Sequence, residues 1–194
     1  MDINYRRYKW FFTSAGKLVV GGKNAEQNDE LLRKLQKSRE DLIIMHTSFP
    51  GSPFSVILAS INSINKEDIE ECVIFTACFS KYWKDKKRKE KVDIFRLSQL
   101  SKTSSMKTGT WGVKGHVEHK EAPLILVLTI QNEVLRAVPE QSVKKKDRIF
   151  KIVPGNIDKI NLVSIIQKEI LNVSKEDILS ALPAGGIKIQ KYAR

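Results

Sequence analysis

The spacing of apolar residues in the first third of the chain changes from that of strands to that of a helix. Two short runs at 10–13 and 17–20 are rich in aromatic and β-branched residues, and the Ser-Ala-Gly segment between them predicts a hairpin. Asn24 then has the side chain of a helix cap, with Gln27 three residues later. Leucines at helical spacing continue to about Lys37, which predicts an amphipathic helix.

The middle of the chain predicts a second helix and a largely antiparallel sheet. Asn65 and Asp68 have the spacing of a capping box, and apolar positions at helical spacing continue from there towards Trp83. Gln131 and Asn132 predict a tight turn between the last two strands. The strands themselves are expected at 41–46, 56–59, 92–97, 110–117, 124–130 and 133–137.

The composition changes after Pro139, where a small C-terminal unit is expected. Its segments are a basic connector at 144–148, a strand at 149–153, a short helix at 162–170, a helix from Ser174 to before Pro183, and an apolar run at 187–189. Together the elements predict an α+β fold: an antiparallel or mixed β-sheet with packed helices, plus a small C-terminal helical unit. We expect a main domain at 1–138, with the connector and the C-terminal unit at 139–194.

The net charge of the chain indicates which class of partner it attracts. Its 194 residues include 34 Lys and Arg and 22 Asp and Glu, which gives a formal net charge of +12. A surface with this positive potential attracts polyanions, so nucleic acid and an anionic membrane are both candidate partners. The plain alternative is a basic surface that serves only solubility.

The basic residues are most concentrated at 81–91, where seven of eleven residues are Lys or Arg. This segment is too polar to bury, so we expect a mobile loop or a frayed helix end. Trp83 borders the lysine cluster at 84–91, and Trp111 lies in a predicted glycine-rich strand; each ring could pack in the core or stack on a base. Lys23 precedes a predicted helix N-terminus, where a phosphate could bind. The predicted nucleic-acid contacts are Lys23, Lys84, Lys86, Lys87, Arg88, Lys89, Lys102, Lys107, Trp111 and Lys114.

Residues for catalysis or metal binding are sparse. His116 and His119 lie on opposite faces of a predicted strand and its exit, with too few ligands nearby for zinc, and no nucleophile-elbow or phosphate-loop pattern occurs. We therefore expect no enzymatic activity, no metal and no cofactor. Cys72 and Cys78 fit neither a zinc pair nor a disulfide framework, and no apolar run has the length of a signal-peptide core or a membrane span. A cytoplasmic location without integral membrane association is expected.

A series of short motifs extends from about Trp10 to Ile189. They are FTSAG at 12–16, GGKNAEQNDE at 21–30, DL at 41–42, PGS at 50–52, CFSKYW at 78–83, LSK at 100–102, GTWGVKG at 109–115, PL at 123–124, VPG at 153–155 and ALPAGG at 181–186. In order and spacing they resemble the NFACT-R RNA-binding domain of the NEMF and RqcH ribosome-quality-control factors. The resemblance assigns RNA binding to the domain at 1–138. It implies contact with transfer RNA or ribosomal RNA and with the large ribosomal subunit during rescue of stalled translation.

The chain departs from the family pattern at several positions. Family members usually have histidine where an ungapped comparison places Met45 and Pro53, and His46 is displaced by one residue, which reverses its face on a strand. The glycine pair is usually followed by Arg and Asp, whereas this chain has Lys23 and Asn24. The sequence does not include the large N-terminal NFACT region. We therefore expect a stand-alone protein, half of a split factor partnered by a separate chain, or an excised fragment.

Three functions follow from the sequence. Non-catalytic binding of transfer RNA or ribosomal RNA in ribosome-associated quality control is the leading interpretation. The second is an accessory RNA-binding module for a separate RNA-modification enzyme. The third is binding to DNA or to an anionic membrane, which the basic segment at 81–91 would equally serve.

Overall fold

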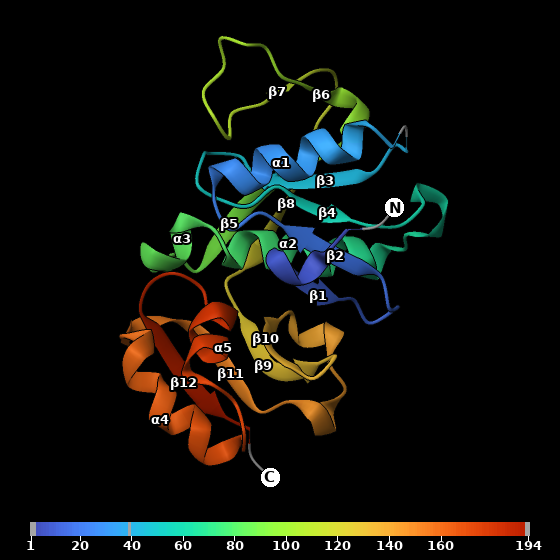
Figure 1. Cartoon of the computed structure of the whole chain (residues 1–194). Helices are drawn as coiled ribbons and strands as arrows, with labels where there is room; N and C mark the ends of the chain where they lie inside the picture. The colour runs from blue at the N-terminus through green and yellow to red at the C-terminus, as the bar shows by residue number, and fades with distance from the viewer. Residues whose placement is uncertain (1–2, 39, 193–194) are drawn as a thin grey trace.

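The computed structural model describes residues 3–38 and 40–192 and confirms an α+β fold, with antiparallel sheets and packed helices (Figure 1). The first large sheet has the strand order β1-β2-β4-β3-β5-β8. The bounds of its strands are β1 Lys9–Phe12, β2 Leu18–Gly21, β3 Ile43–Thr47, β4 Ser55–Ile57, β5 Lys89–Arg96 and β8 Glu118–Pro123. No helix in the described ranges combines the length and apolarity that a membrane crossing requires.

Two helices cover opposite faces of the first sheet. The helix α1 spans Ala25–Gln36 and the helix α2 spans Lys66–Cys78. Neighbouring residues of a strand point to opposite faces, so Val19 packs in the hydrophobic cluster that contains α2, whereas Val20 packs in the cluster that contains α1. The sheet therefore contributes one face to each of two hydrophobic cores.

Both helices begin where the sequence predicts. The side-chain oxygen of Asn24 accepts a hydrogen bond from the amide of Gln27 at 2.8 Å, and that of Asn65 accepts one from the amide of Asp68 at 2.7 Å. The Asp68 carboxylate in turn accepts from the Asn65 amide at 3.0 Å, which completes a capping box. These bonds satisfy amides that have no partner inside the helix, so the predicted caps are confirmed.

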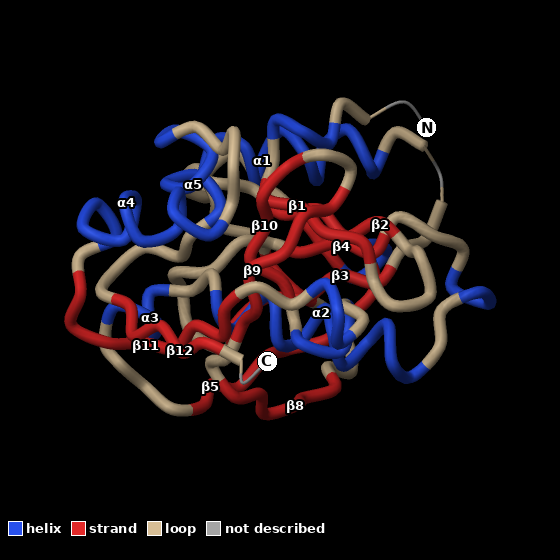
Figure 2. Tube along the Cα trace, turned by 90° about the horizontal axis from the view of Figure 1, so that it is seen from below, coloured by secondary structure: helices blue, strands red, loops and turns tan. Residues whose placement is uncertain are grey.

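The second sheet has the order β10-β9-β11-β12, and the helices α4 and α5 lie together on one side of it (Figure 2). The bounds are β9 Leu126–Gln131, β10 Val134–Val138, β11 Phe150–Ile157, α4 Lys159–Glu169, α5 Lys175–Ala181 and β12 Ile187–Lys191. This sheet takes strands from both sides of residue 138. The division of the chain at that position stays a prediction.

The helix α2 lies between the two sheets (Figure 1). All residues at 72–78 are buried, and they share a hydrophobic cluster with Val19 and Met45 of the first sheet and with Leu126 and Ile187 of the second. The molecule is thus layered, with α1, the first sheet, α2 and the second sheet in succession.

Two buried acids of α2 hold neighbouring loops. Asp68 accepts a hydrogen bond from the hydroxyl of Thr13 at 2.5 Å. Glu71 accepts from the hydroxyl of Ser14 at 2.5 Å and from that of Ser142 at 2.7 Å. The hairpin turn between β1 and β2 is therefore bonded directly to α2, and Glu71 also connects it to the segment that follows β10.

The prediction of a loop or frayed helix end at 81–91 holds only for the exposed residues 85–88 and is wrong on either side of them. The short helix α3 spans Lys81–Lys84, and β5 already begins at Lys89. Trp83 is fully buried and its indole nitrogen donates to the carbonyl of Gly186 at 3.1 Å, so this ring belongs to the core. From Lys89 onward exposed and buried residues alternate as in any strand, which a count of charges does not reveal.

The glycine-rich segment at 110–117 forms much less strand than predicted. Only β7, Gly112–Val113, is extended, and it pairs with β6, Leu100–Ser101. The next strand, β8, is absent from the prediction because its residues are mostly polar and exposed. Ala122 is its one buried residue.

Two further boundaries differ from the prediction. The turn between β9 and β10 is formed by Asn132 and Glu133, whose φ angles are 46° and 64°, so it lies one residue later than expected. The strand β11 does not end before Pro154 but continues to Ile157, with an irregularity in its pairing to β12 after Pro154.

Candidate nucleic-acid interface

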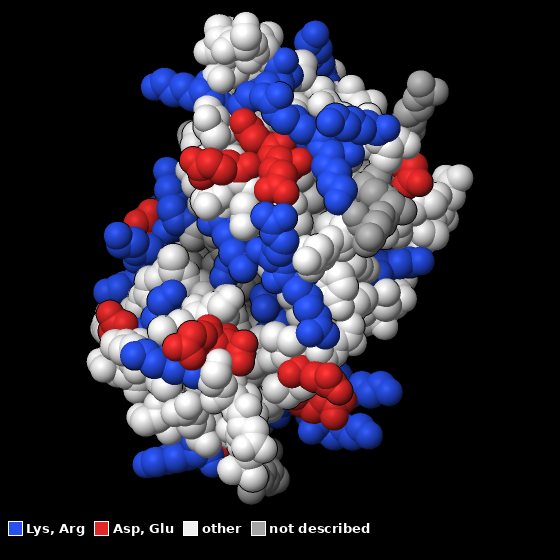
Figure 3. Space-filling model, viewed as in Figure 1, with Lys and Arg blue, Asp and Glu red and all other residues white. Residues whose placement is uncertain are grey.

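A cleft of about 800 Å³ opens between the N-terminal end of α1 and the loop that follows α5; we name it the central cleft. Figure 3 shows that Lys and Arg side chains gather between these two elements. The lining includes the residues at 22–25, 46–54 and 108–111, together with Lys9, Asp93, Lys159, Ser180, Leu182 and Ala184.

Lysines from distant parts of the chain meet in the central cleft. Lys9 lies on β1, Lys23 precedes α1 and Lys159 is the first residue of α4. Arg136 of β10 is close enough for its charge to lower the pKa of both Lys9 and Lys23. We name Lys9, Lys23, Arg136 and Lys159 the cationic cluster. Among the described residues that line the cleft, the one acid is Asp93.

Lys9 is the most constrained member of the cationic cluster. Its ammonium donates a hydrogen bond to the carbonyl of Ser180 at 2.7 Å and lies 4.8 Å from the centre of the Phe79 ring. Burial, with the charges of Arg136, Lys159 and Lys23 acting in the same direction, lowers the pKa of Lys9 to about 7. Near neutral pH the amine is therefore poised between its charged and neutral forms.

Arg136 is buried at 5% exposure, with its guanidinium carbon 4.8 Å from the centre of the Trp10 ring. Burial lowers the pKa of Arg136 to about 10, and the charge of Asp177 acts against this shift. No residue within the described ranges accepts a hydrogen bond from its Nε. A buried cation with an unused donor is costly, and a nearby anion would offset that cost.

The N-terminal end of α1 forms part of the same wall. The amide of Lys23 donates to the Gln27 side chain at 3.1 Å. A side chain at Gly22 would approach the Asn28 oxygen to 2.2 Å, so only glycine fits there. That Asn28 oxygen accepts a hydrogen bond from the amide of Phe54 at 3.1 Å, which ties α1 to the loop between β3 and β4. The positive end of the helix dipole adds to the field of the lysines.

His46 lies in the cleft wall, whereas Met45 is fully buried in the cluster around α2. The His46 ring stacks on Phe54 with 4.3 Å between ring centres, and its Nδ1 is 2.7 Å from the carbonyl oxygen of Thr47. Burial lowers the pKa of His46 below its ordinary value. The one-residue displacement noted in the sequence thus puts the histidine on the cleft side of β3.

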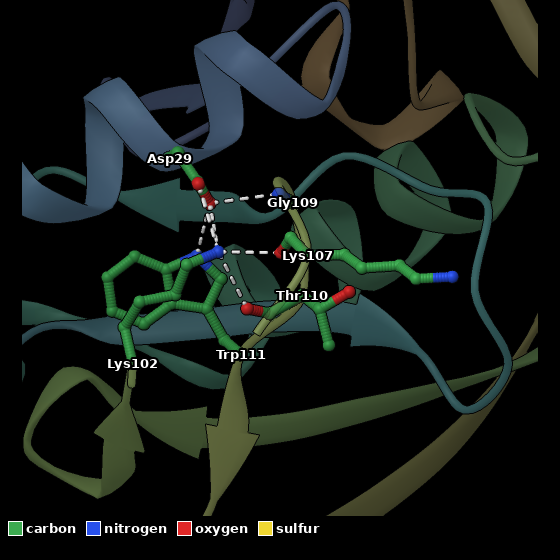
Figure 4. A network of polar contacts seen from close by, with 6 residues as sticks. All are labelled: Asp29, Lys102, Lys107, Gly109, Thr110 and Trp111. Carbon is green, nitrogen blue, oxygen red and sulfur yellow. Dashed lines mark hydrogen bonds and ion pairs between the residues drawn. The ribbon is translucent and has the colours of Figure 1, made fainter. Parts of the chain in front are cut away.

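A polar network around Asp29 fixes the loop at 103–111 against α1 (Figure 4). The Asp29 carboxylate accepts from the Trp111 indole at 2.7 Å and from the Gly109 amide at 3.1 Å, and it pairs with Lys102 at 2.9 Å. The Lys102 ammonium also donates to the carbonyls of Lys107 and Thr110 at 2.8 and 2.9 Å. Burial opposes ionisation of Asp29, but these bonds outweigh it and hold its pKa below the usual range.

The ten predicted contact residues fall into three groups. Lys23 lines the central cleft. Lys102 and Trp111 belong to the Asp29 network, where Trp111 is only 8% exposed and the Lys102 ammonium bonds within the protein. Outside the cleft lining, the exposed residues of the set are Lys84, Lys86, Lys87, Arg88, Lys89, Lys107 and Lys114.

Five of these exposed residues form what we name the basic ridge: Lys84 and 86–89. Lys86 donates to the Asn156 side chain at 2.5 Å, and Lys89 pairs with Glu121 at 3.4 Å on the open surface. Gly185 lies against the backbone of Lys84, so the ridge adjoins the loop after α5 that forms one wall of the cleft. The role of the ridge in binding stays a prediction.

Lys9, Arg136 and Lys159 were not among the contact residues predicted from the sequence. These residues are far apart along the chain, and no local motif connects them. Arg136 alone carried a signal, because it is the single charged residue in the apolar run Val-Leu-Arg-Ala-Val of β10. A charge at an inward position of a strand indicates either a buried ion pair or a functional site.

Comparisons with known proteins point in one direction. Residues 7–115 match the family model described as the NFACT protein RNA binding domain. The chain is 28% identical over 200 residues to the archaeal Rqc2 homolog aRqcH of Methanocaldococcus jannaschii, a match that covers 96% of this chain and 29% of that protein. The chain therefore spans a minor part of the length of this relative.

A solved structure shares the fold. It is the C-terminal part of the fibronectin/fibrinogen-binding protein from Streptococcus suis, with a TM-score of 0.53 and 23% sequence identity. The match covers 60% of this chain and 45% of that one. At this level of identity the likeness concerns the fold alone.

Proposed function

This chain belongs to the family of NFACT protein RNA binding domains, and from that premise we propose that it is a non-catalytic RNA-binding protein of ribosome-associated quality control. The proposed ligand is transfer RNA or ribosomal RNA, and the proposed site of action is the large ribosomal subunit in the cytoplasm.

The observation that supports this proposal most strongly is the convergence of three lysines of the cationic cluster on one cleft, with the buried Arg136 near two of them. Four positive side chains from β1, the start of α1, β10 and α4 repel one another in the free protein. RNA phosphates would relieve that repulsion and release counterions as they bind. The basic ridge beside the cleft offers an outer surface along which the same RNA backbone could continue.

Transfer RNA is expected to bind with an affinity that falls steeply with salt. For a single-stranded contact region, the logarithm of the affinity should decrease with the logarithm of the salt concentration by roughly 0.7 per phosphate contact. Filter binding with transfer RNA, duplex DNA and anionic vesicles compares the candidate polyanions, and co-sedimentation with ribosomes tests the proposed site of action. Equal affinity for all three polyanions, or an RNA affinity that ignores salt, would contradict the proposal.

The RNA affinity is also expected to fall as the pH rises through neutrality. Lys9 has a pKa of about 7 in the free protein, and only its ammonium form attracts a phosphate. A bound phosphate would raise that pKa, so binding takes up a proton, and the affinity should drop by about tenfold between about pH 6 and about pH 8. Equilibrium titrations at matched ionic strength measure this.

Lys9→Arg is the matched control for the pH dependence, because an arginine keeps its charge throughout this range. Its affinity profile should be flat. Arg136, with a pKa of about 10, stays charged across the interval. His46 also lines the cleft, and burial lowers its pKa below the ordinary value, so it is the other group whose charge could change with pH. A slope that persists in Lys9→Arg would assign the effect to His46 and not to Lys9.

A further inference from the structure

An aromatic side chain stands unpacked at the central cleft. Phe49 is 63% exposed, lies two residues after the end of β3 and lines the same cleft as the three lysines. A single exposed apolar side chain is ordinary on a protein surface, but one that shares a cleft with cationic side chains offers a flat face on which a base can stack.

The loop that carries Phe49 is held in place by hydrogen bonds. The hydroxyl of Thr47 donates to the carbonyl of Phe49 at 2.7 Å, and the amide of Thr47 donates to the hydroxyl of Ser52 at 2.9 Å. The amide of Lys81, at the start of α3, donates to the carbonyl of Gly51 at 2.7 Å. Phe49 is therefore presented by a fixed backbone, so little conformational entropy is lost when a flat ligand group packs on it.

Polar groups that could meet the edge of a base line the cleft beside Phe49. Ser48 and Asp93 belong to the lining, and the Ser48 hydroxyl donates to the Asp93 carboxylate. That carboxylate is also held from outside the lining by the Nδ1 of His119 at 2.7 Å. The Nδ1 of His46 is paired with the Thr47 carbonyl oxygen, so the other ring nitrogen, Nε2, is the one that could bond to a base. The cleft thus combines a cationic part, an aromatic ring and hydrogen-bonding groups within about 800 Å³, a volume in the range of small-molecule sites.

On the premise of the proposed RNA binding, we infer that the central cleft receives one unpaired nucleotide of the RNA. Its phosphate meets Lys9, Lys23 and Lys159, and its base stacks on Phe49. Stacking requires a free base face, which a nucleotide inside a duplex does not offer, so the preferred ligand is an unpaired loop or end of a structured RNA. The exposed ring, the fixed loop and the lysines in one cleft carry this inference.

The test compares two small ligands that differ only in the base. Adenosine 5′-monophosphate and ribose 5-phosphate are titrated into the full chain and followed by nuclear magnetic resonance. A stacked base should make the nucleotide bind at least about fivefold more tightly than the sugar phosphate. Phe49→Ala should bring the nucleotide down to the affinity of the sugar phosphate and leave the sugar phosphate unchanged. Phe49→Tyr, which keeps a flat ring, should restore the difference.

Leu171→Ala is the matched control, since Leu171 is an apolar residue that is 82% exposed and lies outside the cleft lining. It should change neither affinity. Equal affinities of the two ligands in the unmodified chain, or a difference that survives Phe49→Ala, would overturn the inference while salt-sensitive transfer RNA binding still stood. Failure of the unmodified chain both to bind transfer RNA and to co-sediment with ribosomes would instead refute the proposed function.

Discussion

Replacing Lys9, Lys23 and Lys159 together by glutamine should reduce the affinity for RNA by about 100-fold at about 0.1 M salt. The figure follows from three lost phosphate contacts, each of which contributes roughly 0.7 to the slope of log affinity against log salt. The salt slope should therefore fall by about two. Stability should change little, because relief of the repulsion around Lys9 offsets the loss of the bonds that Lys9 and Lys159 make to the carbonyls of Ser180 and Leu179.

The matched comparison is a second variant with the basic ridge neutralised, in which Lys86, Lys87, Arg88 and Lys89 become alanine. These residues are exposed and lie outside the cleft lining, so thermal stability should change little. If the cleft is the main binding surface, the ridge variant should lose less affinity than the cleft variant. Near-normal binding by the cleft variant, together with a large loss in the ridge variant, would move the site to the ridge.

Trp111→Ala should lower the free energy of unfolding by about 3 to 5 kcal/mol, the usual cost of removing a large buried ring. Trp111 is only 8% exposed, and its indole nitrogen donates to Asp29 at 2.7 Å. The substitution would leave a cavity and deprive Asp29 of one of the bonds that keep it ionised. Urea unfolding followed by circular dichroism gives the change in free energy directly.

Two companion measurements separate packing from base stacking at Trp111. Trp111→Phe keeps most of the ring volume and loses the hydrogen bond, so its loss of stability should be smaller, about 1.5 to 3 kcal/mol for a bond to a charged group. RNA affinity is measured on the folded fraction of each variant. Normal stability of Trp111→Ala, with binding weakened by about 1 to 3 kcal/mol, would show that the ring stacks on a base.

The features that sequence predicts well are those whose causes are local. Asn24 and Asn65 each cap a helix through an amide three residues away, so the pattern lies within one turn. The charged segment at 81–91 misled the prediction because charge was taken as a sign of disorder. At its end Lys89 and Lys91 occupy outward positions of β5, while Glu90 and Val92 point inward. Trp83 is buried through a bond to Gly186, more than a hundred residues away.

The candidate site was less predictable than the fold because most of its residues are far apart in the sequence and meet only through packing. Lys23 was found because it adjoins a helix N-terminus, a feature visible in a short stretch of sequence. Lys9 and Lys159 come to one cleft only when β1 and α4 are brought together by packing, and neither has a distinctive neighbour in sequence. Lys102 was predicted as a contact for its charge, whereas three hydrogen-bond acceptors within the protein hold its ammonium.

The position of α2 has a consequence for how the molecule loses its structure. Because residues 72–78 are buried against strands of both sheets, neither sheet can separate without exposing that apolar helix to water. We therefore expect the two sheets to melt as one cooperative unit, with the amide protons of α2 exchanging with solvent only through global unfolding.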